Sequence, residues 1–247
     1  MLLFQPPPIT RYDLNFNLMG IPVRVHPLFW LLVLLFASAS RGFLQILIWV
    51  AVIFFSILLH EMGHALSMRG FGRDAEIVLY HGGGLTIPRN ESWGKSWASV
   101  SFTHKQEIIV SLSGSLAGFF LVTILLTIIQ FSGGSVGLTW LFGLIPFPII
   151  ELASNSLVLN GLVISLVWVN LFWGFINLMP VLPLDGGSIA QHLFLMADSY
   201  AGYQKAYQLS FIAAVLVALF GLVLLRSMYL ALIFGFLAYQ SYQALKR

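Results

Sequence analysis

The chain has 247 residues, of which 59% are hydrophobic and only 9% are charged, and its mean hydropathy is +0.91. Soluble domains carry about 25% charged residues, so these values exclude an ordinary soluble domain and predict a multi-pass membrane protein. The formal net charge is only +3, and the absence of cysteine excludes disulfides and thiolate metal sites.

Six apolar stretches without charged residues are candidate transmembrane helices, because a helix needs about 20 residues to cross the hydrocarbon core. In chain order they cover residues 27–40, 42–59, 108–131, 157–179, 206–225 and 227–245. A further apolar segment, residues 138–150, is only 13 residues long and contains Pro146 and Pro148. We therefore expect this segment to be re-entrant or interfacial rather than a seventh crossing.

The distribution of positive charge agrees with six crossings. If the amino terminus is cytoplasmic, ten Lys and Arg residues lie inside and two lie outside, whereas a seventh crossing changes this ratio to 8 to 4. Because cytoplasmic segments are enriched in Lys and Arg, we expect both termini to be cytoplasmic. The outside residues are Arg41 and Arg226, and the inside residues are Arg11, Arg24, Arg69, Arg73, Arg89, Lys95, Lys105, Lys205, Lys246 and Arg247.

Two segments outside the apolar stretches have the alternating pattern of β-strands. Residues 14–25 alternate around Gly20, and residues 75–88 predict a second strand or hairpin that contains three consecutive glycines. The expected fold is therefore an all-α polytopic membrane protein, with about six transmembrane helices and a small β-sheet on the cytoplasmic side. Residues 1–247 are expected to form a single membrane-embedded domain.

The sequence HEMGH at residues 60–64 matches the H-E-x-x-H zinc signature. On a continuous helix His60 and His64 share one face, and Glu61 lies beside the metal as general base. Gly63 and Ala65 are small enough to let another element approach. About 27 Å of apolar helix precedes His60, which predicts a site near the cytoplasmic end of that helix. The alternative is two buried histidines bonded to backbone carbonyls, which is disfavoured because ionisable residues at membrane depth are expensive.

Zinc needs a third protein ligand, and Asp185 is the strongest candidate. It follows a charge-free run, residues 152–184, in which Pro180 and Pro183 end the helix, and two glycines after it let the backbone turn. For Asp185 to lie beside the two histidines, the chain must cross the membrane an even number of times between His64 and Asp185. The predicted spans at residues 108–131 and 157–179 provide two crossings. The alternative is a helix-capping or loop aspartate. Four other histidines could replace Asp185, although each is more typical of a surface or interfacial position: His26, His81, His104 and His192.

These motifs resemble the site-2 proteases, which are intramembrane zinc metalloproteases. The resemblance covers most of the core, from GIPVRVHPLFW through HEMGHALSMRGFG and HGGGLT to NLFWGFINLMPVLPLDGG. It implies that His60, His64 and Asp185 bind one zinc ion (Zn2+) and that Glu61 activates water. It also implies that Asn177 helps to hold the substrate or the developing oxyanion.

The function implied by this resemblance is hydrolysis of a peptide bond in or near a transmembrane segment of a membrane-protein substrate. The catalytic core would cover about residues 42–187, and the chain has room for neither a PDZ nor a CBS domain. A substrate helix must unwind before cleavage, and the strand around Gly82, Gly83 and Gly84 could pair with it by strand addition. The lipid bilayer is the other expected partner. Topology and anionic lipid explain the basic face, so no nucleic-acid partner is expected.

Other interpretations of the motifs are weaker. A metal transporter could use the same His and Asp cluster as a transit site, but the other spans carry almost no ionisable side chains. An inactive homologue would lack a ligand or the base, and none is missing. GGSVG at residues 133–137 fits a serine nucleophile pattern with HGGG, but Ser135 is expected in a flexible loop on the opposite side of the membrane. GSLAG at residues 114–118 is expected to pack helices.

Overall fold

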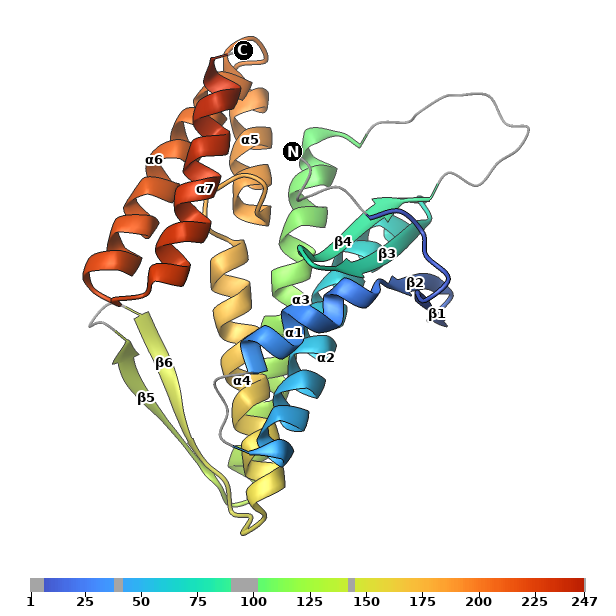
Figure 1. Cartoon of the computed structure of the whole chain (residues 1–247), viewed down its shortest axis with the longest axis vertical. Coiled ribbons are helices and arrows are strands. Elements are labelled where there is room, and N and C mark those ends of the chain that lie inside the picture. Colours follow the sequence, from blue (N-terminus) through green and yellow to red (C-terminus); the bar gives the residue numbers. More distant parts are fainter. Residues whose placement is uncertain (1–6, 38–41, 90–101, 142–144, 247) are drawn as a thin grey trace.

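The computed structural model describes residues 7–37, 42–89, 102–141 and 145–246. Figure 1 shows a bundle of helices with a small sheet on one side. The helices are α1 (Pro27–Ala37), α2 (Phe43–Gly70), α3 (His104–Phe131), α4 (Leu157–Asn177), α5 (Asp185–Ala197), α6 (Gly202–Val223) and α7 (Met228–Leu245). The strands are β1 (Leu14–Leu18), β2 (Ile21–Val25), β3 (Ala75–Tyr80), β4 (Gly83–Pro88), β5 (Ser135–Leu141) and β6 (Ile145–Glu151).

Four of the described helices are long and apolar enough to cross a membrane, namely α2, α3, α4 and α6. They correspond to four of the six predicted spans and confirm the membrane class. α1 has 11 residues, or about 16 Å of helix, whereas the hydrocarbon core is about 30 Å thick. The end of that predicted span, residues 38–40, lies outside the described residues, as does Arg41. α7 has 18 residues and is not among the four, so the count of six spans remains a prediction.

Both α2 and α3 extend beyond their apolar stretches. α2 runs from Phe43 to Gly70 without a break, so the H-E-x-x-H motif lies inside a continuous helix. α3 begins at His104 because Thr103 and Gln106 form a capping box. The backbone N–H of Gln106 donates to the Thr103 hydroxyl, and the backbone N–H of Thr103 donates to the Gln106 side chain. His104, expected at a surface or interfacial position, is therefore the first residue of a helix.

Small and polar residues join α2, α3 and α4. Gly63 on α2 faces α3, where an added Cβ would overlap the carbonyl oxygen of Ser113 and would lie 2.8 Å from its carbonyl carbon. The side-chain amide of Asn170 on α4 donates to the Ser56 hydroxyl on α2 at 2.9 Å, and both residues are buried. Gly118 on α3 leaves room for Asn170, which confirms that GSLAG packs helices. These contacts hold the three helices at close distance.

The predicted small sheet is present and has four strands in the order β1-β2-β3-β4. β1 and β2 are antiparallel and turn at Gly20, whose φ of +78° favours glycine. β2 and β3 are parallel, and β3 and β4 are antiparallel. β3 and β4 both contact α2. The sheet packs on the helices through buried apolar side chains that include Ile21, Val23, Val25, Ile77 and Leu79.

Residues 135–151 form a second, two-stranded antiparallel sheet, β5–β6, so the all-α expectation is wrong for this segment. Ser135, expected in a flexible loop, is the first residue of β5, and its hydroxyl donates to Oε2 of Glu151 at 3.2 Å. Pro146 and Pro148 disfavour a helix, whereas the β-branched and aromatic residues around them favour strands. In Figure 1 the hairpin returns to the end of the bundle from which it starts. It therefore adds no crossing between α3 and α4.

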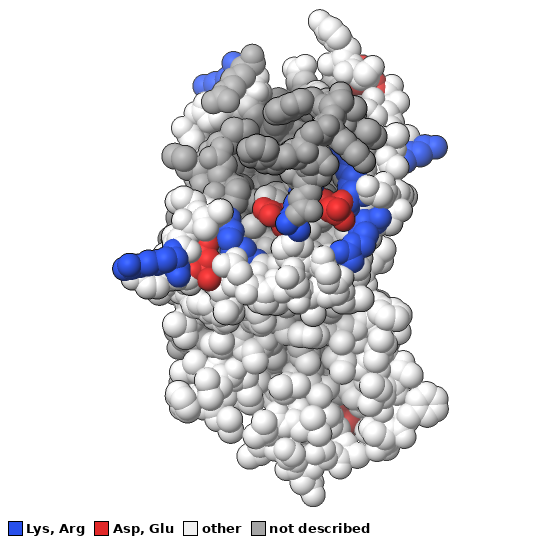
Figure 2. Space-filling view, turned by 90° about the vertical axis from the view of Figure 1, so that its right-hand side faces the viewer, with Lys and Arg blue, Asp and Glu red and all other residues white. Residues whose placement is uncertain are grey.

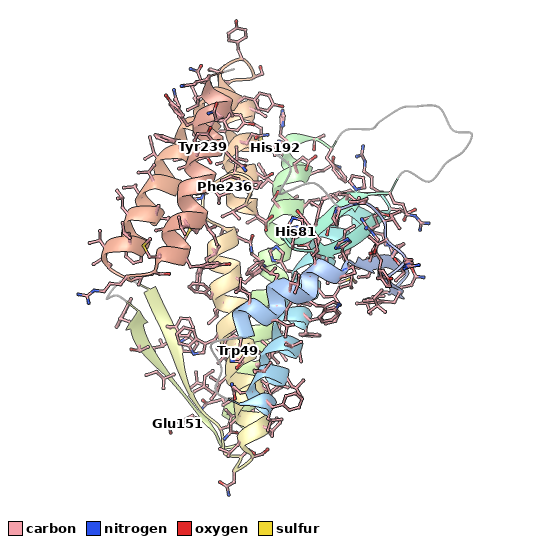
Figure 3. The ribbon with its side chains drawn as sticks, in the orientation of Figure 1. Trp49, His81, Glu151, His192, Phe236 and Tyr239 are labelled. Atoms are coloured by element: carbon pink, nitrogen blue, oxygen red, sulfur yellow. The ribbon has the colours of Figure 1, made fainter. Side chains whose placement is uncertain are left out.

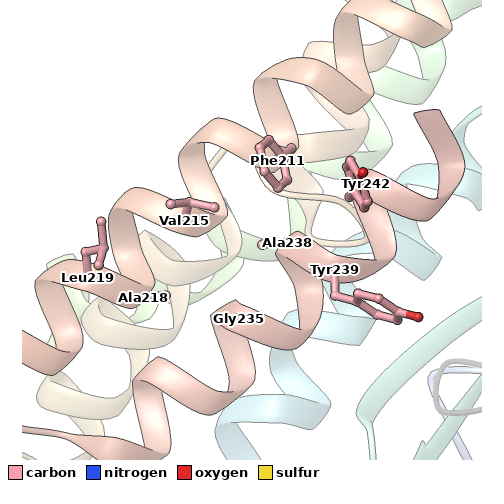
Figure 4. A pocket seen from close by; sticks show the side chains of 8 residues that line it. All are labelled: Phe211, Val215, Ala218, Leu219, Gly235, Ala238, Tyr239 and Tyr242. Carbon is pink, nitrogen blue, oxygen red and sulfur yellow. The ribbon is translucent and has the colours of Figure 1, made fainter. Parts of the chain in front are cut away.

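α6 and α7 form a helical hairpin beside the other helices (Figure 1). An apolar groove runs along it, as Figure 4 shows from close by. Its lining residues are Phe211, Val215, Ala218, Leu219, Gly235, Ala238, Tyr239 and Tyr242. All of them belong to α6 or α7, so the groove is separate from the H-E-x-x-H motif on α2.

Charged side chains gather on one half of the face that Figure 2 shows. Figure 2 shows Lys, Arg, Asp and Glu on the upper half of this face and almost none on the lower half. A surface without charge is what the hydrocarbon region of a membrane requires.

Replacing Gly63 with alanine should destabilise the protein, because the new Cβ would overlap the backbone of α3. Overpacking of this kind costs about 1–3 kcal/mol. The matched control is Gly70→Ala in the same helix, where a Cβ meets nothing within 4 Å. Thermal unfolding in detergent should show a lower midpoint for Gly63→Ala and no decrease for Gly70→Ala. Equal midpoints for the two variants would contradict the close approach of α2 and α3.

Candidate metal centre

Three potential metal ligands come together where the start of α5 meets α2. His60 and His64 are buried on α2, and Asp185 is half-buried at the first position of α5. The Nε2 atoms of the two histidines are 3.1 Å apart. Oδ2 of Asp185 lies 3.1 Å from Nε2 of His60 and 3.5 Å from Nε2 of His64. The structure thus brings together the three residues that were predicted from the sequence, although 121 positions separate His64 from Asp185.

The spacing of these three atoms fits a shared metal ion. Ligands at about 2.0–2.1 Å from a tetrahedral zinc ion lie about 3.3 Å from one another. Oδ2 of Asp185 is buried and has no well-directed hydrogen bond within the described part of the chain. A buried carboxylate oxygen without a well-directed hydrogen bond is costly, and a cation between the three atoms would remove that cost. Two imidazoles and one carboxylate are also a donor set that zinc accepts.

A backbone carbonyl on α3 orients His64. Nδ1 of His64 lies 2.7 Å from the carbonyl oxygen of Val110. Because a carbonyl can only accept, Nδ1 carries the proton and Nε2 keeps its lone pair for a metal. The alternative, in which both histidines bond to backbone carbonyls, explains Nδ1 of His64. It does not explain Nε2 of His64, which faces Nε2 of His60.

A glycine on α3 makes room for the histidine pair. A Cβ at Gly114 would overlap Nε2 of His64 and would lie 2.8 Å from Cε1 of His60. Only a residue without a side chain lets α3 pass this close to both rings. The approach of α3 also brings the Val110 carbonyl within reach of His64.

The loop between α4 and α5 sets the position of Asp185. The N-cap of α5 is Leu184, which makes no side-chain capping bond, so the structure does not support the helix-capping alternative for Asp185. The backbone N–H of Leu182 donates to the Ser210 hydroxyl on α6 at 2.8 Å. That hydroxyl also pairs with the Ser241 hydroxyl on α7 at 2.8 Å. The α6–α7 hairpin therefore holds the loop that carries the third potential ligand.

Glu61 is buried beside the ligands, and β4 orients its carboxylate. The Thr86 hydroxyl lies 2.7 Å from Oε2 of Glu61 and donates to it. The same hydroxyl is 3.1 Å from the backbone carbonyl oxygen of Glu61. A Cβ at Gly84 would overlap the Glu61 side chain, so this glycine keeps the strand close to the carboxylate. Thr86 was not selected from the sequence, where a threonine in a strand carries no distinguishing signal.

The other predicted site residues lie at the end of α4 and around the start of β4. Asn177 is the last residue of α4, and its side-chain amide donates to the carbonyl oxygen of Trp173 at 2.9 Å. Gly82 lies in the turn between β3 and β4, and Gly83 and Gly84 begin β4. A Cβ at Gly83 would lie 3.7 Å from the Trp173 ring. The glycine segment thus lies between α4 and Glu61.

None of the four other histidines joins the three-ligand group among the described residues. Nδ1 of His26 accepts a hydrogen bond from the backbone N–H of Leu28 at 3.2 Å. His81 lies at the turn after β3, and His192 lies on α5 (Figure 3). His104 contacts His192, with their Nδ1 atoms 3.0 Å apart.

Comparison with known proteins agrees with this geometry. The chain matches the model of Peptidase family M50 over residues 48–221. It is 25% identical over 213 residues to a zinc metalloprotease of Methanocaldococcus jannaschii, with 84% of this chain and 53% of that protein covered. It is 26% identical over 190 residues to stage IV sporulation protein FB of Bacillus subtilis, with 77% of this chain and 52% of that protein covered. The chain spans about half the length of these curated relatives.

A solved structure has the same fold. The site-2 protease from Methanocaldococcus jannaschii aligns with a TM-score of 0.56 and 24% sequence identity, over 95% of each chain. The family match covers more than half of this chain and includes His60, Glu61, His64 and Asp185. The chain therefore belongs to peptidase family M50, as its resemblance to the site-2 proteases predicted.

Proposed function

We propose that this chain is an intramembrane zinc metalloprotease, which hydrolyses a peptide bond in or near a transmembrane segment of a membrane-protein substrate. The observation that carries this proposal is the convergence of His60, His64 and Asp185 beside Glu61, in a bundle whose helices are apolar and long enough to span a membrane. Membership of peptidase family M50 supports the same function.

His60, His64 and Asp185 would hold one zinc ion. When bound, zinc supplies Lewis-acid chemistry that activates water and polarises the scissile carbonyl. Glu61 takes the proton from the attacking water and later delivers it to the leaving amine. The Thr86 hydroxyl, 2.7 Å from Oε2 of Glu61, keeps this carboxylate in one orientation.

β4 is the proposed binding strand for the unwound substrate segment. It lies at the edge of the four-stranded sheet, where only β3 pairs with it among the described strands. An edge strand offers backbone N–H and C=O groups to an added peptide. A Cβ at Gly82 would overlap the Tyr80 ring, and Gly84 lies directly against the Glu61 side chain. A peptide paired with this part of β4 would therefore lie next to the general base.

Two polar groups on α4 could fix the substrate further. The indole N–H of Trp173 is buried without a hydrogen-bond partner in the described part of the chain, and the ring lies near Gly83. Asn177 is one helical turn further along α4. In this proposal both side chains donate to substrate carbonyls, and Asn177 helps to hold the substrate or the developing oxyanion.

The proposal includes six transmembrane helices, with α1 and α7 as the first and last. It also places both termini and the active site near the cytoplasmic face. The excess of Lys and Arg predicted for the inside supports this orientation. So does the gathering of charge on the upper half of the face that Figure 2 shows. The lipid bilayer is the second partner, and no nucleic-acid partner is expected.

A metal transporter that uses the same three ligands is not supported. Transport offers no role for Glu61 or for the bond that Thr86 makes to it, whereas hydrolysis requires an oriented general base. Family membership also favours a peptidase over a transporter.

Glu61→Gln should abolish cleavage of a membrane-embedded substrate without changing the zinc content, because an amide cannot take up the proton from water. Cleavage would be followed by mass spectrometry with purified protein in detergent. The control is Glu76→Gln, which changes an acidic residue on β3 outside the centre and should retain activity. Chelation should stop cleavage by the wild type, and added zinc should restore it. Cleavage by Glu61→Gln, or metal flux without cleavage by the wild type, would contradict the proposal.

Thr86→Val should lower kcat by about ten-fold or more and leave KM nearly unchanged, because it removes the hydroxyl that orients the general base. Valine keeps the shape of the side chain and the strand propensity. Thr86→Ser restores the hydroxyl and should recover most of the rate. If the valine and serine variants have the same kcat, the bond between Thr86 and Glu61 has no catalytic role.

A further inference from the structure

A second pair of histidines lies outside the centre described above. His104 is the exposed first residue of α3, and His192 is half-buried on α5. Their Nδ1 atoms are 3.0 Å apart, and their ring centroids are 5.2 Å apart at an interplanar angle of 41°. Figure 3 shows His192 between α5 and the start of α3. The capping box at Thr103 fixes where α3 begins, and so fixes the position of His104.

The separation of the two ring nitrogens fits two ligands of one metal ion. Its nitrogen separation of 3.0 Å is close to the 3.1 Å between the Nε2 atoms of His60 and His64. Two imidazole nitrogens at this distance can share one proton, or each can give a lone pair to the same metal ion. Ligands of a tetrahedral ion lie about 3.3 Å apart, so binding needs only a small adjustment of the two rings.

A carboxylate next to the pair favours metal binding. Glu107 is three residues after His104 and therefore lies on the same face of α3. Burial lowers the pKa of His192, the nearby His104 lowers it further, and the carboxylate of Glu107 acts in the opposite direction. A lowered pKa favours the neutral imidazole of His192, which keeps a lone pair for a metal. Among the described residues only the catalytic group has three ligand atoms already close together, so Glu107 would turn towards the histidines on binding.

We infer that His104, His192 and Glu107 form a second binding site for a divalent transition-metal ion, which bridges α3 and α5. Two imidazoles and one carboxylate prefer ions such as Zn2+, Co2+ and Ni2+ over Mg2+ or Ca2+. This site goes beyond the proposed proteolytic function and does not depend on it.

The position of the second site links it to the catalytic ligands. His192 follows Asp185 by seven residues, or about 10 Å along α5. α3 and α5 also touch through the hydroxyls of Ser111 and Ser188, which are 3.2 Å apart. A metal ion between the helices would hold α5 more firmly against α3, and so would restrict the movement of Asp185.

The test is a titration of metal-free, full-length protein with Co2+ in detergent, using protein purified without a polyhistidine tag. The wild type should bind two Co2+ ions per chain, whereas His104→Ala and His192→Ala should each bind one. Glu107→Gln should weaken the second site by about ten-fold. The double variant His60→Ala/His64→Ala should retain the second site, and the matched control His81→Ala should still bind two ions. One Co2+ per wild-type chain, or two ions in both His104→Ala and His192→Ala, would overturn the inference.

A second measurement remains informative if a variant folds poorly. In wild-type protein that already holds one equivalent of zinc, a second equivalent should raise the thermal midpoint, because ligand binding to the folded state stabilises it. The same addition should not change the midpoint of His192→Ala. The absence of a shift in the wild type would also overturn the inference. Neither experiment measures cleavage, so failure of the proteolytic function would leave both results interpretable.

Discussion

The rest of the structure depends on the meeting of three potential ligand atoms from two distant parts of the chain. His60 and His64 project from one turn of α2, whereas Asp185 is reached only after α3 and α4 have returned the chain to the same end of the bundle. The hairpin β5–β6 follows α3 and precedes α4 in the sequence. Because its two strands are antiparallel, the chain leaves the hairpin at the end of the bundle where it entered. Gly63 and Gly114 allow α3 to lie against the histidines. Together these features bring Nε2 of His60, Nε2 of His64 and Oδ2 of Asp185 to within 3.1 to 3.5 Å of one another.

Neighbouring elements fix each functional group separately. The Val110 carbonyl on α3 orients His64, and the Thr86 hydroxyl on β4 orients Glu61. The Ser210 hydroxyl on α6 holds the loop that ends at Asp185. A polar group without a partner is expensive in an apolar interior, so each of these bonds also stabilises the fold. The sheet and the α6–α7 hairpin are therefore parts of the site, although neither supplies a proposed metal ligand.

Local patterns in the sequence predicted the potential ligands. The sequence did not show which distant elements contact one another. Helical spacing and charge at membrane depth indicated His60, His64 and Asp185, and strand alternation indicated a small sheet without its number of strands. Thr86 gave no signal, because its role depends on β4 lying next to α2. The hairpin β5–β6 was not predicted, because a short apolar segment with two prolines is typical of a re-entrant or interfacial segment as well as of strands. The early start of α3 could have been recognised from the capping box at Thr103.

The central claim is that Asp185 completes a zinc site with the two histidines of α2. X-ray absorption at the zinc edge tests it most directly, using His192→Ala protein loaded with one equivalent so that the second site stays empty. We predict two imidazole nitrogens and carboxylate or water oxygens at about 2.0–2.1 Å. Adding Asp185→Ala should release the zinc or remove an oxygen from this shell. An unchanged spectrum and zinc content in the Asp185→Ala protein would contradict the account.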